Sequence, residues 1–83
     1  MEKTYEELLR EVIALLAPLA PEGRTVGEET DFVADLEFDS LKVMGFVEKV
    51  EDRFDISVPL NLLPDIRTVR DFVVHLQRLL GER

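Results

Sequence analysis

LKVMGFVEKVEDRF, residues 41–54, is the stretch that decides the fold, because its apolar residues recur with the period of an α-helix. At about 100° per residue, one sector of this predicted helix collects the side chains expected to be buried: Val43, Phe46, Val47, Val50 and Phe54. The opposite sector holds Leu41, Met44, Gly45, Glu48, Glu51, Asp52 and Asp55, and a narrow third sector holds Lys42, Lys49 and Arg53. The outer sector is therefore apolar beside Ser40 and acidic further along.

One further helix is predicted before this stretch and one after it. Thr4 followed by Glu7 has the spacing of a capping box, and an apolar stripe follows at Tyr5, Leu8, Leu9, Val12 and Leu16 until Pro18 and Pro21 end the helix. Thr68 followed by Asp71 opens the last helix in the same way, with a stripe at Val69, Phe72, Val73, Leu76, Leu79 and Leu80, and Gly81 suits its end.

The segments between these helices complete the predicted fold. Residues 60–66 are compatible with a short third helix, although Pro64 forbids a regular one through its centre. Strand-like alternation does not occur at useful length, so we expect an all-α fold of four helices with a short third one. A loop of about twenty residues leads to Asp39, and its expected anchors in the core are Val26, Phe32, Val33, Leu36 and Phe38. Thr30 is expected to cap a short helical turn through Leu36.

Composition narrows the class of protein further. Eighty-three residues predict one domain, 1–83, and the absence of cysteine together with a single histidine excludes disulfides, thiolate chemistry and a histidine metal cluster. Apolar stretches are too short to span a membrane, which favours a cytoplasmic protein. The formal net charge is −8, which disfavours nucleic acid as a partner. Residues 28–65 contain eleven acids and three bases, so this one segment carries the whole imbalance and indicates a basic partner.

Ser40, at the start of the predicted helix 41–54, is the most informative polar residue. It either caps the helix or is esterified by a phosphate, which a helix N-terminus favours, and position alone does not separate these possibilities. Self-contained catalysis is not expected, because a nucleophile needs an adjacent base, whereas His75 lies on the last helix and is expected to be a partly buried boundary residue. A calcium loop starting at Asp35 fails because Phe46 stands where a glutamate ligand is required.

The stretch DLEFDSL, residues 35–41, followed by Phe54-Asp55-Ile56 and Pro59, resembles the acyl carrier protein family. The resemblance runs over nearly the whole chain and has no gap between Ser40 and Leu76. It implies a four-helix bundle that carries 4′-phosphopantetheine on the serine of an Asp-Ser-Leu motif, at the start of the second helix. Such a protein is a carrier and not an enzyme.

The resemblance also assigns roles to residues. Ser40 would be the attachment site, flanked by Asp39 and Leu41 for the transferase, and a docking face would comprise Met44, Glu48, Glu51 and Asp52. Val43, Val47, Val50 and Phe54 would line the core that shelters an acyl chain. This sequence departs from the family pattern at Glu37, where the family often has glycine, and at Lys42 and Gly45, where it often has acidic residues. It also departs in the leucine-rich segment 60–64. The leucines of this segment cannot all be buried, so we expect them to make an apolar contact.

The expected function is therefore to hold acyl intermediates as thioesters for a specialised lipid, polyketide or similar pathway. The implied partners are a phosphopantetheinyl transferase and acyl-loading and condensing enzymes with basic docking patches, and the implied state is a monomer. The alternative is an unmodified acidic helical adaptor that binds a basic partner protein.

Overall fold

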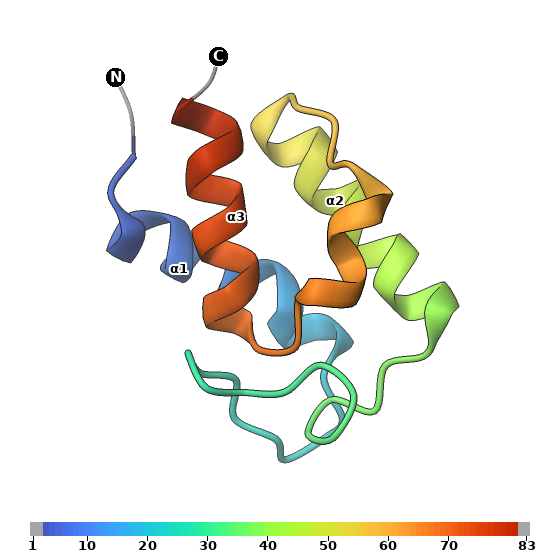
Figure 1. Ribbon diagram of the computed structural model, residues 1–83. Helices are drawn as coiled ribbons and strands as arrows, with labels where there is room; N and C mark the ends of the chain where they lie inside the picture. The colour runs from blue at the N-terminus through green and yellow to red at the C-terminus, as the bar shows by residue number, and fades with distance from the viewer. Residues whose placement is uncertain (1–2, 82–83) are drawn as a thin grey trace.

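The computed structural model describes residues 3–81, without the side chains of Leu60 and Leu62. Its elements are α1 (Tyr5–Leu16), the 3-10 helix η1 (Ala17–Leu19), α2 (Ser40–Phe54), the 3-10 helix η2 (Leu60–Asp65) and α3 (Val69–Gly81). In Figure 1 the loop 20–39 runs beneath the ends at which α2 and α3 begin, and η2 lies between these two helices. The predicted all-α class is confirmed, and residues 3–81 contain no strand beyond one isolated bridge between Asp31 and Thr68.

The predicted count of four helices is not confirmed, because residues 3–81 form three α-helices. The segment expected to be the short helix is η2, a 3-10 helix with Pro64 inside it. The proline lacks a backbone N–H, so a regular α-helical ladder cannot pass through this position. The expected apolar contact of the leucines in 60–64 rests largely on the side chains of Leu60 and Leu62, which lie outside the described residues. No helix in the described part of the chain is long and apolar enough to cross a membrane.

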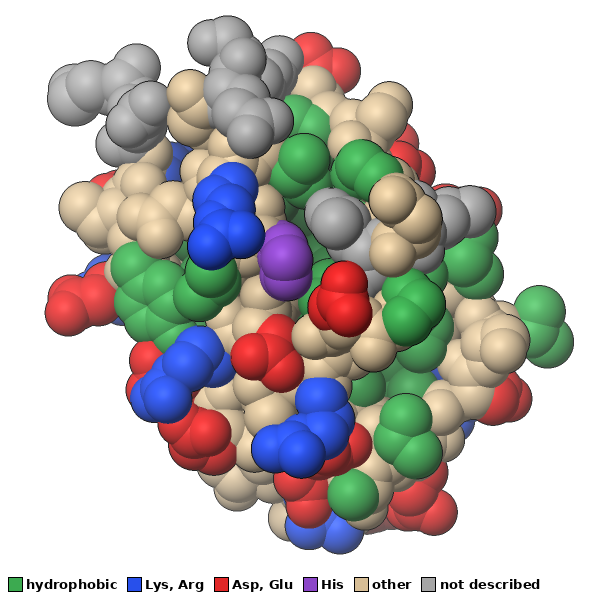
Figure 2. Space-filling view, viewed as in Figure 1, with side chains coloured by type: hydrophobic (Ala, Val, Ile, Leu, Met, Phe, Trp, Pro, Cys, Tyr) green, Lys and Arg blue, Asp and Glu red, His purple; other side chains and the backbone are tan. Residues whose placement is uncertain are grey.

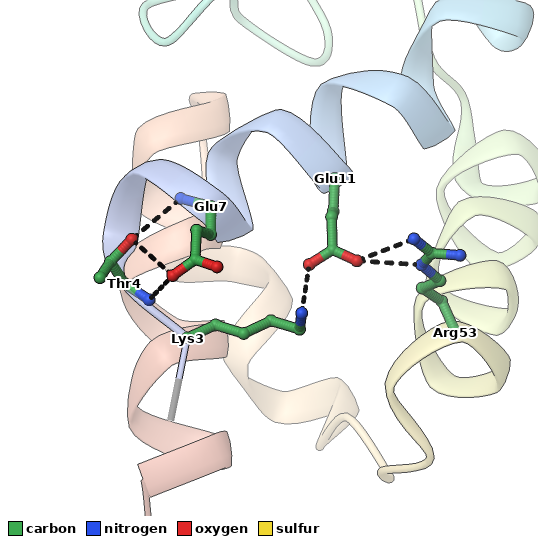
Figure 3. A network of polar contacts seen from close by, with 5 residues as sticks. All are labelled: Lys3, Thr4, Glu7, Glu11 and Arg53. Atoms are coloured by element: carbon green, nitrogen blue, oxygen red, sulfur yellow. Dashed lines mark hydrogen bonds and ion pairs between the residues drawn. The ribbon is translucent and has the colours of Figure 1, made fainter. Parts of the chain in front are cut away.

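The start of α1 confirms the predicted capping box. The Thr4 hydroxyl accepts a hydrogen bond from the Glu7 N–H, and the Glu7 carboxylate accepts one from the Thr4 N–H. Further along α1, Glu11 joins this helix to α2: its Oε1 accepts hydrogen bonds from Arg53 Nε at 3.1 Å and Arg53 Nη2 at 2.9 Å (Figure 3). Lys3 Nζ lies 3.3 Å from the other oxygen of the same carboxylate. One residue of the basic sector of α2 is thus paired within the protein.

The core forms where the three α-helices and the loop meet. The predicted stripes of α1, α2 and α3 supply most of the buried side chains, namely Leu8, Val12, Leu16, Phe46, Val47, Val50, Phe54, Val69, Phe72, Val73 and Leu76. The loop adds Phe32, Leu36 and Phe38, as predicted, and Val26 packs against the core while partly exposed. Val33 was expected to be buried as well, and this prediction is wrong, because its side chain is 68% exposed.

Backbone hydrogen bonds fasten the loop to the start of α3. Phe32 N–H donates to the Arg67 carbonyl at 3.0 Å, Val69 N–H to the Thr30 carbonyl at 3.0 Å, and Arg70 N–H to the Glu28 carbonyl at 2.9 Å. The side chains of the same region add an ion pair of Arg70 with Glu28, which also accepts a hydrogen bond from the Tyr5 hydroxyl. The loop is therefore tied to both α1 and α3.

The turn at residues 31–36 is capped differently from the prediction. The Asp31 carboxylate accepts hydrogen bonds from the N–H groups of Val33 and Ala34, at 2.9 and 2.8 Å. Thr30 instead uses its hydroxyl to accept from Gly27 N–H. The prediction that Thr30 caps this turn is wrong, because the charged carboxylate one residue later is the stronger acceptor.

The start of α3 confirms the second capping box. Asp71 Oδ2 accepts hydrogen bonds from the N–H groups of Thr68 and Arg67, both at 3.0 Å, and the Thr68 hydroxyl accepts from the Asp71 N–H. The bonds from these backbone N–H groups hold the pKa of the Asp71 carboxyl below its usual value. Its ionised form is therefore preferred in the folded protein.

We predict that Asp71→Asn lowers the free energy of unfolding by about 1 kcal/mol at pH 7, the usual contribution of a helix cap. Since the pKa of Asp71 is lowered on folding, this contribution is present above the unfolded-state pKa of about 3.9 and disappears as the pH falls through the lower folded value. The difference between wild type and variant, measured by urea unfolding, should therefore shrink between about pH 5 and pH 2. Asp65→Asn, at an exposed position, is the control, and a pH-independent difference for Asp71→Asn would contradict the prediction.

Candidate functional site

Ser40 is the first residue of α2, and the preceding Asp39 is its N-cap. Asp39 Oδ1 accepts a hydrogen bond from Lys42 N–H at 2.9 Å. The possibility that Ser40 caps the helix is thus excluded, because Asp39 fills that position. Ser40 is exposed, and within residues 3–81 its hydroxyl makes no hydrogen bond. The hydroxyl is therefore free to react with a group brought from outside.

A cavity of about 630 Å³ lies directly beside Ser40. Its walls come from the loop, from α2, from the region of η2 and from α3, and they are Phe32, Val33, Phe38, Asp39, Ser40, Val43, Met44, Phe46, Val47, Leu63, Pro64, Ile66 and Phe72. Of the four residues expected to line an acyl-sheltering core, Val43 and Val47 line this cavity. Val50 and Phe54 are buried in the core, as expected, and do not line this cavity. Apart from Asp39 and Ser40, the lining is apolar, so the cavity suits a hydrocarbon chain.

Exposed hydrophobic side chains gather around the same place. In the described part of the chain, the large hydrophobic residues that are exposed are Val33 at 68%, Leu41 at 83% and Met44 at 36%. Val33 and Met44 line the cavity together with Ser40, and Leu41 is the next residue in α2. Figure 2 shows hydrophobic side chains over η2 and the adjoining part of the loop, whereas acidic and basic side chains are intermixed over the start of α3. Exposed apolar residues that gather in one place are typical of a contact surface.

The acidic residues of α2 divide into two kinds. Glu48 and Asp52 are exposed. Glu51 is partly buried, and its Oε2 accepts a hydrogen bond from Val58 N–H at 2.8 Å. This bond holds the chain that leaves α2 against the helix, so Glu51 has a structural contact that the sequence does not reveal. Of the three carboxylates on the predicted docking face, those of Glu48 and Asp52 are exposed to solvent, and that of Glu51 is hydrogen-bonded to the backbone.

Glu37, just before the Asp-Ser-Leu motif, has a left-handed backbone conformation with φ of 57°. Its N–H donates to the Val33 carbonyl at 3.1 Å, and the next residue, Phe38, is buried. The chain therefore turns sharply here before it enters α2. This is the conformation that glycine adopts without a steric penalty, which gives a physical reason for the glycine implied by the family resemblance.

The polar residues of the cavity lining are Asp39 and Ser40. Among the residues that line the cavity there is no histidine, lysine or arginine to act as a base or to polarise a substrate. His75 is half-buried on α3, as predicted, and does not line the cavity. The described residues contain no group of three or more acidic, histidine or cysteine side chains placed to hold a metal ion.

A phosphodiester on Ser40 fits this environment. The first N–H groups of a helix have no intrahelical acceptor, and together with the helix dipole they favour a negative charge at this end. Asp39 satisfies one of these groups, the N–H of Lys42. The exposed hydroxyl leaves room for a bulky substituent, and the cavity beside it is lined mainly by apolar side chains.

Comparison with known proteins finds a matching family model and several similar proteins. Residues 7–76 match the family model described as "Phosphopantetheine attachment site". The acyl carrier protein of Rhodococcus erythropolis is 33% identical over 85 aligned positions, which cover 99% of this chain and 91% of the relative. The meromycolate extension acyl carrier protein of Mycolicibacterium smegmatis is 34% identical, covering 95% and 81%, and the acyl carrier protein of Thermobifida fusca is 31% identical, covering 93% and 95%.

We predict that Glu37→Gly raises the free energy of unfolding by up to about 1 kcal/mol. A left-handed conformation costs an L-residue about 1–2 kcal/mol, and glycine gives back about 0.5–1 kcal/mol through its freedom in the unfolded chain. Glu22→Gly is the matched control, because Glu22 is an exposed loop glutamate without a positive φ, and this variant should be less stable than wild type. Urea unfolding measures both, and a loss of stability in Glu37→Gly would contradict the prediction.

Proposed function

Because this chain belongs to the acyl carrier protein family, whose members carry 4′-phosphopantetheine and are not enzymes, we propose that the prosthetic group is attached to Ser40. The observation that carries the proposal is the exposed Ser40 hydroxyl, left without an internal hydrogen bond in residues 3–81 because Asp39 caps α2. The other described serine, Ser57, is also exposed, but it does not line this cavity.

The residues around Ser40 have different roles in the proposed carrier function. Asp39 fixes the start of α2, and the N-terminal N–H groups of this helix favour the phosphate. When bound, the prosthetic group supplies a thiol that holds acyl groups as thioesters, which explains how a carrier functions without any cysteine of its own. The cavity walls then keep the apolar part of the cargo away from water between two enzymes.

The proposed cargo is an acyl chain of a specialised lipid pathway. Two observations support this class of cargo: the apolar cavity of about 630 Å³ beside Ser40, and relatives at 30–35% identity that are named meromycolate extension acyl carrier proteins. Burial of hydrocarbon is favourable by roughly 0.8 kcal/mol for each CH₂ group. A cavity of this kind therefore favours long apolar chains over short or polar acyl groups.

The proposed docking face combines Leu41 and Met44 near Ser40 with Glu48 and Asp52 further along α2. The first pair is exposed and apolar, and the second pair is exposed and acidic. Exposed ion pairs contribute only about 0.2–1 kcal/mol each, so acidic residues here speed the encounter with basic enzymes without making the complex long-lived. Weak docking suits a protein that visits several enzymes in turn.

We predict that coexpression with a phosphopantetheinyl transferase adds the mass of one 4′-phosphopantetheinyl group to wild type and to Ser57→Ala, but not to Ser40→Ala. Intact-mass spectrometry measures the adduct, and circular dichroism verifies that both variants are folded. An adduct that persists in Ser40→Ala would place the attachment elsewhere. If no competent transferase produces an adduct on wild type, the carrier function is wrong and the unmodified acidic adaptor is favoured.

We also predict that the double variant Glu48→Lys with Asp52→Lys slows loading at least fivefold at low ionic strength, because it reverses the charge that attracts a basic enzyme. The difference should shrink at high salt, which screens charges on the surface. Glu6→Lys with Glu22→Lys makes the same change in net charge at exposed positions on α1 and in the loop, and it should load at close to the wild-type rate. Equal rates for both double variants would contradict a docking face on α2.

A further inference from the structure

Phenylalanine is concentrated at the cavity beside Ser40. The chain contains five phenylalanines, and four of them line this cavity, namely Phe32, Phe38, Phe46 and Phe72. The fully buried leucines of the core do not line it, namely Leu8, Leu16, Leu36 and Leu76. Burial of either side chain removes apolar surface from water to a similar benefit, so the need for a core does not explain this separation. The wall of the cavity is therefore rich in aromatic rings, whereas the rest of the core is mainly aliphatic.

The four rings form one connected network. The centroid of Phe32 lies 6.0 Å from that of Phe38, 5.8 Å from that of Phe46 and 6.2 Å from that of Phe72. The centroids of Phe46 and Phe72 are 4.9 Å apart, and their planes meet at 54°. Tilted rings at about 4.5–7 Å attract each other, because the face of a ring is negative and its edge is positive. Since all four rings also line the cavity, the network has a side at which a further ring can pack in the same way.

The cavity has an accessible rim and a deeper aromatic wall. Val33 and Met44 line it and are exposed, whereas Phe46 and Phe72 line it and are only 1% and 3% exposed. A group that enters from solvent therefore meets Val33 and Met44 first and the rings further in. A cavity of about 150 Å³ lined by Leu, Ile and Phe is large enough for one benzene molecule. At about 630 Å³, this cavity has room for a ring together with the chain that carries it.

We propose that the preferred cargo is an acyl group that ends in an aromatic ring, which packs against the phenylalanines of the cavity wall while the arm on Ser40 carries its other end. This inference rests on the proposed function and narrows its cargo. A wall of aliphatic side chains would exclude water from any hydrocarbon equally well. The rings add an attraction that depends on the quadrupole of the bound group, which a saturated chain or ring lacks. The cavity therefore distinguishes an aromatic end from a saturated end of the same size.

The test loads the protein, by means of a phosphopantetheinyl transferase, with 6-phenylhexanoyl, 6-cyclohexylhexanoyl or dodecanoyl arms, which contain equal numbers of carbon atoms. Cleavage of the thioester by hydroxylamine is then timed, and each rate is divided by that of the same acyl group on free pantetheine. The 6-phenylhexanoyl protein should be cleaved at least threefold more slowly than the 6-cyclohexylhexanoyl protein, because the aromatic ring holds the arm in the cavity for longer. The Tm of the 6-phenylhexanoyl protein should also be the highest of the three, since bound cargo stabilises the fold.

Three variants locate the source of the preference. Phe38→Leu and Phe72→Leu should each reduce the threefold difference, whereas Phe54→Leu should keep it, because Phe54 is buried but does not line the cavity. Circular dichroism verifies that each variant is folded.

Two outcomes would overturn the inference and leave the carrier function intact. The first is equal protection of the 6-phenylhexanoyl and 6-cyclohexylhexanoyl arms on wild type, which needs no variant. The second is a preference that persists in both Phe38→Leu and Phe72→Leu, which would show that the rings of the wall are not its cause. Failure of any transferase to load wild type would overturn both the inference and the carrier function.

Discussion

The ring of Phe32 packs against Phe46 of α2 and Phe72 of α3, with ring centroids 5.8 and 6.2 Å away, and the placement of Ser40 depends on this contact. A loop of this length has no helix of its own to orient it, so buried side chains must do so. Phe32, with Leu36 and Phe38, brings the chain to Asp39 in a fixed direction. Since small domains are stable by only about 5–15 kcal/mol, a single buried phenylalanine is a substantial fraction of the whole.

Neighbouring polar residues in and beside α2 have different structural roles. Asp39 uses its carboxylate to cap α2, which leaves the neighbouring Ser40 hydroxyl accessible. Glu51 binds Val58 N–H and shapes the exit from the same helix, while Glu48 and Asp52 face solvent. Asp39 and Glu51 therefore stabilise the backbone around the site. Ser40, Glu48 and Asp52 are the residues that are exposed to solvent there. We therefore expect substitutions of Asp39 or Glu51 to lower the stability of the fold, and substitutions of Ser40, Glu48 or Asp52 to affect the proposed modification and docking.

Periodicity in the sequence predicted the three α-helices and most of the core, and the capping boxes at Thr4 and Thr68 were confirmed. These features depend on residues close together in sequence. In the loop the prediction failed for Val33, because an irregular segment has no period from which to read its buried side. It also failed where two neighbouring acceptors compete, as Thr30 and Asp31 do. The hydrogen bond of Glu51 and the walls of the cavity depend on tertiary contacts that no local pattern records.

The hydrogen bonds from residues 28–32 of the loop to residues 67–70 have a consequence for protein synthesis. The two partners are separated by almost forty residues, so the loop cannot acquire these bonds while the ribosome is still making α2 or η2. Although Ser40 leaves the ribosome at mid-chain, its surroundings become complete only when the beginning of the last helix has emerged. The fold thereby couples formation of the proposed attachment site to synthesis of α3, so that chains truncated before α3 present this site in an incomplete form.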